Sequence, residues 1–169
     1  MYHGSILEIP APDISLGRSN LDFGSGFYVT TLQQQAEKWA ARRAKPLKRR
    51  GEEVMPIVSV YEFDSQNLEI LTFDGYTEEW LDFVSENRAK SDTTKIQKYD
   101  AVFGNIADDD VAATIDEYIR LIGIGRVNID VKMGTLYQLT FSEPNNQYCI
   151  TTQKGINALK FIKSYSSEE

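Results

Sequence analysis

Residues 22–31, with the sequence DFGSGFYVTT, constrain the fold most because a turn signal runs directly into a strand signal. The first half is rich in turn formers, since glycine tolerates positive φ and Asp and Ser bond to nearby backbone. The second half, residues 27–31, holds only aromatic and β-branched side chains, which favour a half-buried strand. A glycine turn that delivers Tyr28 into a strand can also hold that ring against a flat ligand. The stretch therefore predicts a tight turn into a core strand and leaves a binding role for Tyr28 open.

Length and composition narrow the class of protein. The 169 residues with 41% hydrophobic content suit one globular domain, which we expect at 1–164, followed by a polar tail at 165–169. No apolar run approaches the roughly 18 residues of a membrane span, and the first residues do not form a charged-then-apolar leader. Cys149 is the single cysteine and His3 the single histidine, which excludes an internal disulfide and disfavours a His/Cys metal site. We therefore expect a cytoplasmic protein with no metal cofactor and no membrane partner.

The charge is unevenly distributed along the chain. The net charge is −7, yet residues 38–50 contain seven basic side chains and no acidic one. The other 11 basic and 25 acidic residues give −14. Such a block can attract phosphate, nucleic acid or an acidic protein. Cations near a helix C-terminus also favour the helix dipole, so both interpretations stay open.

Hydrophobic periodicity predicts short strands with helices grouped between them. Strands are expected at 2–5, 27–31, 56–63, 68–73, 99–106 and 147–152. Helices are expected at 33–44, 77–90, 108–122 and from 152 or 153 to about 163, with Pro46 ending or kinking the first. Met133, Leu136 and Tyr137 favour a further short helix within 126–141, although Gly134 opposes it. This order predicts an α+β fold with a largely antiparallel or mixed sheet.

Familiar nucleotide-binding and hydrolase motifs (GxxxxGK[ST], HExxH and GxSxG) do not occur in the sequence. Three short motifs at expected strand–loop junctions are spread across the chain instead. They are Tyr2-His3-Gly4-Ser5, Gly26-Phe27-Tyr28 and Asn146-Gln147-Tyr148.

In order and spacing, these motifs resemble the His–Tyr–Glu class of ADP-ribosyltransferases, which includes diphtheria toxin and the poly-ADP-ribose polymerases. The segments LDFGSGFYVTT, YDAVFGNIADDDV and NNQYCITTQKGINALKFI more closely resemble a family of small bacterial proteins related to these transferases and named only as a domain of unknown function. Its members often occur in toxin–antitoxin settings. The resemblance implies an ADP-ribosyltransferase-like fold, a mixed and largely antiparallel split sheet with flanking helices. It also implies NAD as co-substrate, a protein or nucleic-acid acceptor and a cognate antitoxin.

The resemblance implies a role for each matching residue. His3 would hydrogen-bond the adenine-side ribose, and the Gly4 backbone would bind the nicotinamide carboxamide, since glycine permits close approach. Tyr28 would stack on the nicotinamide ring, with Trp39 near the other face. The implied NAD-binding set is His3, Gly4, Ser5, Gly26, Phe27, Tyr28 and Trp39, and the implied catalytic set is His3, Tyr28 and Gln147. The structural alternatives are an edge histidine, a core tyrosine and a core anchor of the first long helix.

Gln147 departs from the class, which commonly has glutamate at this position. Cleavage of the nicotinamide–ribose bond passes through an oxocarbenium-like transition state, and an amide cannot place a negative charge opposite it. An amide can still accept from a ribose hydroxyl. Asp109 and Glu143 are candidate sources of the missing charge.

We therefore expect an NAD-dependent mono-ADP-ribosyltransferase that acts as a bacterial toxin on a macromolecule, because Gln147 argues against polymer synthesis. An NAD glycohydrolase is the second hypothesis. A catalytically inactive module that binds NAD or nucleic acid is the third.

Overall fold

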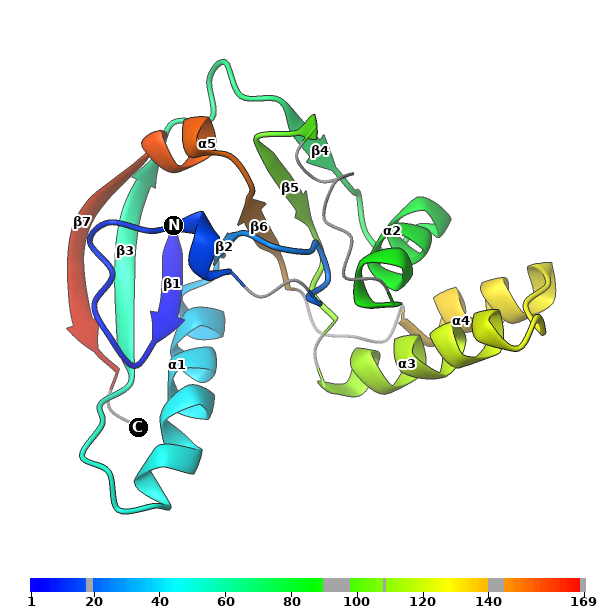
Figure 1. Cartoon of the computed structure of the whole chain (residues 1–169), viewed down its shortest axis with the longest axis horizontal. Helices are drawn as coiled ribbons and strands as arrows, with labels where there is room; N and C mark the ends of the chain where they lie inside the picture. Colours follow the sequence, from blue (N-terminus) through cyan, green and yellow to red (C-terminus); the bar gives the residue numbers. More distant parts are fainter. Residues whose placement is uncertain (18–19, 90–97, 108, 140–144, 168–169) are drawn as a thin grey trace.

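The computed structural model describes residues 1–17, 20–89, 98–107, 109–139 and 145–167. Within these residues the chain forms two β-sheets, five α-helices and one short 3-10 helix, η1 (Ile14–Leu16) (Figure 1). All strand pairs are antiparallel except one. This confirms the predicted α+β class and the largely antiparallel pairing.

The first sheet is covered on its outer face by the long helix α1 (Gln33–Lys48). Its strand order is β1 (Tyr2–Ser5), β3 (Ile57–Phe63) and β7 (Leu159–Ser166). The buried side of α1 consists of alanines, which let the helix lie close to β1. A Cβ atom at Gly4 would lie 2.1 Å from the carbonyl oxygen of Ala36, so only glycine permits this packing.

The second sheet packs against the remaining long helices. Its order is β2 (Phe27–Val29), β6 (Gln147–Ile150), β5 (Ala101–Gly104) and β4 (Ile70–Thr72), with β4 and β5 parallel. The helices α2 (Glu78–Ala89), α3 (Asp109–Gly123) and α4 (Ile129–Leu139) cover its outer face. The Thr77 hydroxyl accepts from the backbone N–H of Trp80, which is an N-cap contact at the start of α2.

A second apolar cluster fills the space between the two sheets and includes Phe27, Tyr61 and Ile150. The layers are therefore α1, the first sheet, the second sheet and the group α2–α4 (Figure 1). The sheets meet at an isolated bridge between Tyr2 and Thr30, whose two N–H···O bonds measure 2.8 and 2.9 Å. Beyond this bridge, among the described residues, β1 pairs with β3 and β2 pairs with β6, but the two strands do not pair with each other. We call the region between their unpaired edges the strand split.

The C-terminal end differs from the sequence-based prediction. The expected helix to about residue 163 is wrong, because α5 spans only Gln153–Asn157 and β7 follows at once. Tyr165 and Ser166 are strand residues and not a polar tail, and the Tyr165 hydroxyl donates to Glu37 on α1 at 2.8 Å. The helical spacing of apolar residues here coexists with a strand-like alternation of Leu159 and Phe161, and pairing with β3 over seven positions favours the strand.

Two other helix predictions are refined. Pro46 does not end α1, because the helix continues to Lys48 with Pro46 inside its last turn. The helix expected within 126–141 is present as α4. Its buried residues are Thr135, Leu136 and Leu139, whereas Met133 and Tyr137 are exposed.

Candidate functional site

His3 lies in β1 and reaches across the strand split. Its Nδ1 is 2.6 Å from the carbonyl oxygen of Tyr28 on β2. A carbonyl oxygen only accepts, so Nδ1 carries the proton and Nε2 carries the lone pair. The imidazole stacks on Phe27 with ring centroids 4.5 Å apart. Burial lowers the pKa of His3, and the guanidinium of Arg43 lowers it further, so the ring is neutral near pH 7.

The backbone of Gly4 faces the strand split. Hydrogen-bonded and non-bonded residues alternate along an antiparallel pair. Met1 exchanges two bonds with Tyr61, at 2.6 and 2.8 Å, so His3 is the next residue of β1 that bonds β3. Gly4 therefore points its N–H and C=O away from β3.

These Gly4 groups lie on the same side of β1 as the Tyr2 groups that form the bridge to Thr30. The bridge uses the Tyr2 pair, but β1 and β2 do not pair with each other at Gly4. Gly4 is buried, and within the described part of the chain neither its N–H nor its C=O has a hydrogen-bond partner. Buried backbone groups are nearly always paired in proteins, so this pair of groups is a candidate ligand contact.

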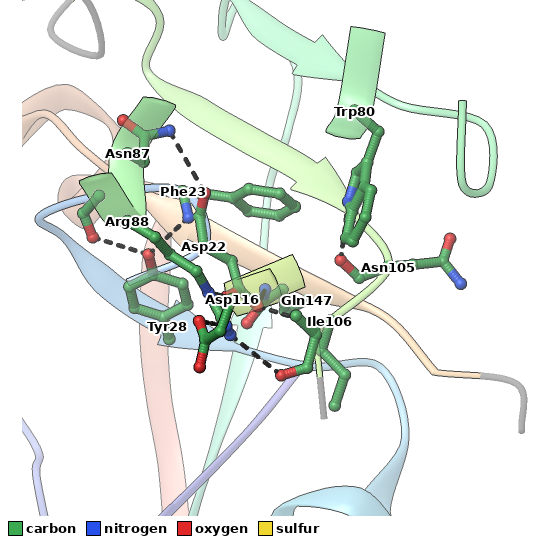
Figure 2. A network of polar contacts seen from close by, with 12 residues as sticks. Asp22, Phe23, Tyr28, Trp80, Asn87, Arg88, Asn105, Ile106, Asp116 and Gln147 are labelled. Atoms are coloured by element: carbon green, nitrogen blue, oxygen red, sulfur yellow. Dashed lines mark hydrogen bonds and ion pairs between the residues drawn. The ribbon is translucent and has the colours of Figure 1, made fainter. Parts of the chain in front are cut away.

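Tyr28 contributes differently from its predicted role. Its hydroxyl donates to the carbonyl of Gly24 at 2.7 Å and accepts from the N–H of Phe23 at 3.1 Å. Its ring packs with the core cluster between the second sheet and α2–α4. Burial raises the pKa of Tyr28 well above its usual range. The hydroxyl thus closes the turn of residues 22–26 (Figure 2). The backbone carbonyl of Tyr28, in contrast, faces His3 in the strand split.

Gln147 begins β6 and its amide is held by a carboxylate. Its Nε2 donates to Oδ2 of Asp22 at 3.0 Å, and that oxygen also accepts the N–H of Ala107 at 2.8 Å. The other oxygen, Oδ1, receives Nε and Nη2 of Arg88 at 2.9 and 2.7 Å (Figure 2). A glutamate at position 147 would face this carboxylate at about 3 Å, so the amide is the chemically matching side chain.

Asp22 and Arg88 form what we call the Asp22 network, together with Gln147 and Ala107. Arg88 also donates to the carbonyl of Ala107 at 3.3 Å, and Asn87 donates to the carbonyl of Asp22 at 3.3 Å. The Asp22 side chain is 11% exposed and that of Arg88 18%. The sequence does not predict this pair, because the partners are 66 residues apart and each has an ordinary local role in a turn or a helix.

The residue before Gln147 connects three elements. Oδ1 of Asn146 accepts from the Thr30 hydroxyl at 3.1 Å and from the Thr31 N–H at 3.0 Å. Its backbone exchanges bonds with the side chain of Gln35 on α1, at 2.6 and 3.2 Å. Asn146 therefore fixes the start of β6 against the end of β2 and the start of α1.

The other predicted residues occupy varied positions. Ser5 ends β1 and is buried, and Gly26 is needed because a Cβ would lie 2.5 Å from Sγ of Cys149. Trp39 is 49% exposed and carries the Arg42 guanidinium 5.7 Å from its ring centre, so it is not a core anchor. Asp109 is the first residue of α3, and its side chain lies outside the described atoms. Glu143 lies outside the described residues altogether.

Two hollows lie away from the strand split. One of about 520 Å³ is lined by residues of α2, α3 and α4 and the α3–α4 turn, and one of about 440 Å³ lies between α1 and the end of β7. Across the described ranges, no three His, Cys, Asp or Glu side chains gather as metal ligands. No helix among those same ranges is long and apolar enough to cross a membrane.

Residues 1–161 match a family described as "Protein of unknown function (DUF3990)". The chain belongs to this family. No curated protein and no solved structure matches it. Membership agrees with the predicted resemblance to a family named only as a domain of unknown function, and the relationship to ADP-ribosyltransferases stays a prediction.

Proposed function

We propose that the protein is an NAD-dependent mono-ADP-ribosyltransferase whose strand split receives the nicotinamide end of NAD. The observation that carries the proposal is the buried Gly4 backbone, which offers one donor and one acceptor without partners among the described residues. A carboxamide has the complementary pair, an N–H donor and a C=O acceptor. The residues therefore fit this co-substrate.

His3 would act as an acceptor for a ribose hydroxyl. The Tyr28 carbonyl holds the Nδ1 proton and Phe27 stacks on the ring, so the imidazole has one orientation and one tautomer. Its Nε2 lone pair is then the atom that receives a hydroxyl proton. The lowered pKa of His3 keeps this lone pair available at neutral pH.

Gln147 would act through its carbonyl oxygen. Asp22 engages Nε2, which orients the amide and leaves Oε1 to accept from a second ribose hydroxyl. The Asp22 carboxylate contacts the Nε2 side of this amide and forms an ion pair with Arg88. It would therefore stabilise positive charge on the ribose less than an unpaired carboxylate would. Weak stabilisation of this kind suits a single transfer better than polymer synthesis.

The same pairing of Asp22 favours a second candidate, a module that binds NAD without cleaving it. Four N–H groups already point at this carboxylate, from Arg88 (two), Ala107 and Gln147. A carboxylate in this state is a poor general base. An NAD glycohydrolase remains an alternative outcome of the same experiment.

The wider setting is also a proposal and rests on the resemblance alone. The protein would act in the bacterial cytoplasm as a toxin on a protein or nucleic acid, with a cognate antitoxin as partner. Growth arrest on expression, relieved by a neighbouring gene product, is the expected result. Unimpaired growth with full-length protein present would count against it.

The test uses NAD labelled on its adenylate, incubated with purified protein and a macromolecular extract. The transferase predicts release of nicotinamide together with label on macromolecules. Free ADP-ribose without labelled macromolecules indicates a glycohydrolase, and NAD binding without nicotinamide release indicates the binding module. Neither binding nor turnover rejects all three.

A substrate analogue tests the Gly4 contact without disturbing the fold. Nicotinic acid adenine dinucleotide replaces the carboxamide by a carboxylate, which cannot donate to the Gly4 carbonyl. We expect its kcat/KM to be lower by about tenfold or more. His3→Asn should also lower turnover, whereas the exposed control Lys160→Gln should leave it unchanged. Equal use of both dinucleotides would contradict the assigned contact.

A further inference from the structure

The basic block of the sequence lies on the solvent face of α1 and on the two residues that follow it. Its seven side chains are all exposed, namely Lys38, Arg42, Arg43, Lys45, Lys48, Arg49 and Arg50. The opposite face of the helix is buried against β1 and consists of Ala36, Ala40 and Ala44. The block is therefore a surface feature and takes no part in the core.

Four of these residues align along the helix. Lys38, Arg42, Lys45 and Arg49 recur at intervals of four, three and four, which places them on one side of an α-helix. We call them the basic row. At 1.5 Å per residue the row is about 16 Å long.

Stabilisation of the helix dipole explains only part of the row. Lys45 lies in the last turn of α1, where a cation is favourable. Lys38 and Arg42 lie one to two turns earlier, and the dipole effect fades within the last turn. The helix dipole therefore does not account for the position of Lys38 and Arg42 in the row.

An aromatic ring lies beside the row. Trp39 is 49% exposed, and the Arg42 guanidinium lies 5.7 Å from its ring centre. Cations flanking an exposed ring are the combination with which proteins hold single strands, because phosphates bind the cations and bases stack on the ring. An acidic protein would match the cations but leave the ring without a partner.

We propose that the basic row and Trp39 bind single-stranded nucleic acid. The surface borders the candidate site. Gln35, one turn before Trp39, holds Asn146 next to Gln147, and Arg43, one turn after it, is near enough to His3 to lower its pKa. A strand on α1 would thus lie beside the strand split. That this nucleic-acid strand is the acceptor of ADP-ribose rests on the proposed function, whereas its binding to α1 does not. Trp39 then serves the acceptor and not the nicotinamide ring.

The acidic remainder of the protein does not prevent this binding. At physiological ionic strength, charges separated by more than about 8 Å are largely screened. Glu52 and Glu53 follow the block directly and limit the surface at that end. The row extends from there toward the start of α1.

The test measures fluorescence anisotropy of a labelled 12-nucleotide uridine strand without NAD, between 50 and 300 mM salt. About four phosphate contacts predict a slope of about −3 for the logarithm of affinity against that of salt. The combined variant Lys38→Gln, Arg42→Gln and Lys45→Gln should weaken binding about tenfold or more and reduce the slope to about −1. Trp39→Ala should weaken binding about tenfold with an unchanged slope.

The matched control is Arg126→Gln, Lys160→Gln and Lys163→Gln, which removes the same charge from exposed positions elsewhere. It should bind within about twofold of the original chain. Binding should also quench the emission of Trp39, since the other tryptophan, Trp80, is fully buried. Thermal melting confirms that each variant is folded.

Several results would overturn the proposal. The first is no binding of the uridine strand at 50 mM salt, and the second is a loss of affinity in the control variant equal to that in the combined variant. The third is displacement of the labelled strand by polyglutamate as effective as by unlabelled strand, and the fourth is an affinity for a duplex as high as for the single strand. Polyglutamate competition would identify a surface for an acidic protein instead. Strand binding without NAD turnover removes only the proposed function, and NAD turnover without strand binding removes only this inference.

Discussion

The strand split lies between the first two predicted motifs and the Asp22 network holds Gln147 of the third, and the two regions treat their polar groups in opposite ways. In the split, the buried N–H and C=O of Gly4 have no partner among the described residues. In the network, both oxygens of Asp22 accept two hydrogen bonds each. An unpaired buried group costs free energy until a ligand pairs it, whereas a saturated one stabilises the fold. Under the proposed function the split would therefore receive the ligand, whereas the network fixes the amide of Gln147.

The largest expected effect is the loss of the Asp22 network. Asp22→Ala leaves the Arg88 guanidinium, 18% exposed, without its main counter-charge and removes the acceptor of Gln147. We expect the free energy of unfolding to fall by about 3–5 kcal/mol, because one partner of a buried ion pair is left alone. Urea denaturation monitored by circular dichroism measures it.

Asp116→Ala is the matched control for this substitution. It removes the other carboxylate near Arg88, which is 71% exposed at 3.5 Å, and should cost less than about 1 kcal/mol. If the two variants lost similar stability, the network would not be the support that we infer.

Gly4→Ala tests whether the packing of β1 against α1 requires glycine at position 4, in addition to the proposed ligand contact. The new Cβ would meet the Ala36 carbonyl oxygen at 2.1 Å and the Ala40 nitrogen at 2.9 Å, and both are backbone atoms of α1. We expect a loss of about 3 kcal/mol, since overpacking must displace the helix. Gly134→Ala on α4 is the control. It meets nothing within 4 Å and should stabilise by up to about 1 kcal/mol. An unchanged midpoint for the first variant would contradict the packing role.

Gln147→Glu introduces the glutamate that the transferase class commonly has at this position. We expect this variant to make the stability of the protein depend on pH. The new carboxyl would face Asp22 at about 3 Å, so the pKa of the introduced glutamate rises above its unfolded value of about 4.3. The folded state then binds more protons than the unfolded one, and stability falls as pH rises above that value. We expect a loss of about 2 kcal/mol at pH 8 and little loss at pH 4, where the protonated acid can donate to Asp22.

The control for that variant is Gln138→Glu at an exposed position of α4, where stability should change by less than about 0.5 kcal/mol at either pH. Denaturation at both pH values measures the difference. A variant at 147 that is equally stable at pH 4 and 8 would contradict the proposed repulsion between the two carboxyl groups. Nicotinamide release, measured in parallel, reports whether the added charge helps turnover.

Local sequence patterns predict most elements of the fold. Strands at β1, β2, β3 and β6 and helices α1–α3 follow from runs of apolar residues with clear period and flanking turn residues. The C-terminal segment was harder, because Leu159 and Ile162 have helical spacing while Leu159 and Phe161 alternate as in a strand. Pairing with β3, about a hundred residues away, decides between them, and periodicity does not contain that information.

The candidate site divides in the same way. The motif residues His3, Gly4 and Gln147 can be picked out in the sequence because three short motifs in order carry the resemblance to the transferase class. Their partners cannot, because Asp22–Arg88 and His3–Tyr28 contacts join residues 66 and 25 positions apart. The ring of Tyr28 is the instructive case. The sequence indicates a strand tyrosine, but only the fold shows that its hydroxyl is used by its own turn.

The smallest expected effect is the titration of His3, which tests the strand split directly. Burial lowers the pKa of His3 in the folded state. The folded protein therefore binds fewer protons than the unfolded chain between that lowered pKa and about 6.5, and stability rises with pH across this window and is constant above it. His3→Asn keeps a donor for the Tyr28 carbonyl and should abolish the rise. Because His3 is the single histidine, its imidazole NMR signals are unambiguous and give the pKa independently. If NAD occupies the split and a ribose hydroxyl donates to Nε2, NAD should lower the pKa of His3 further. An unchanged titration in saturating NAD would place the dinucleotide elsewhere.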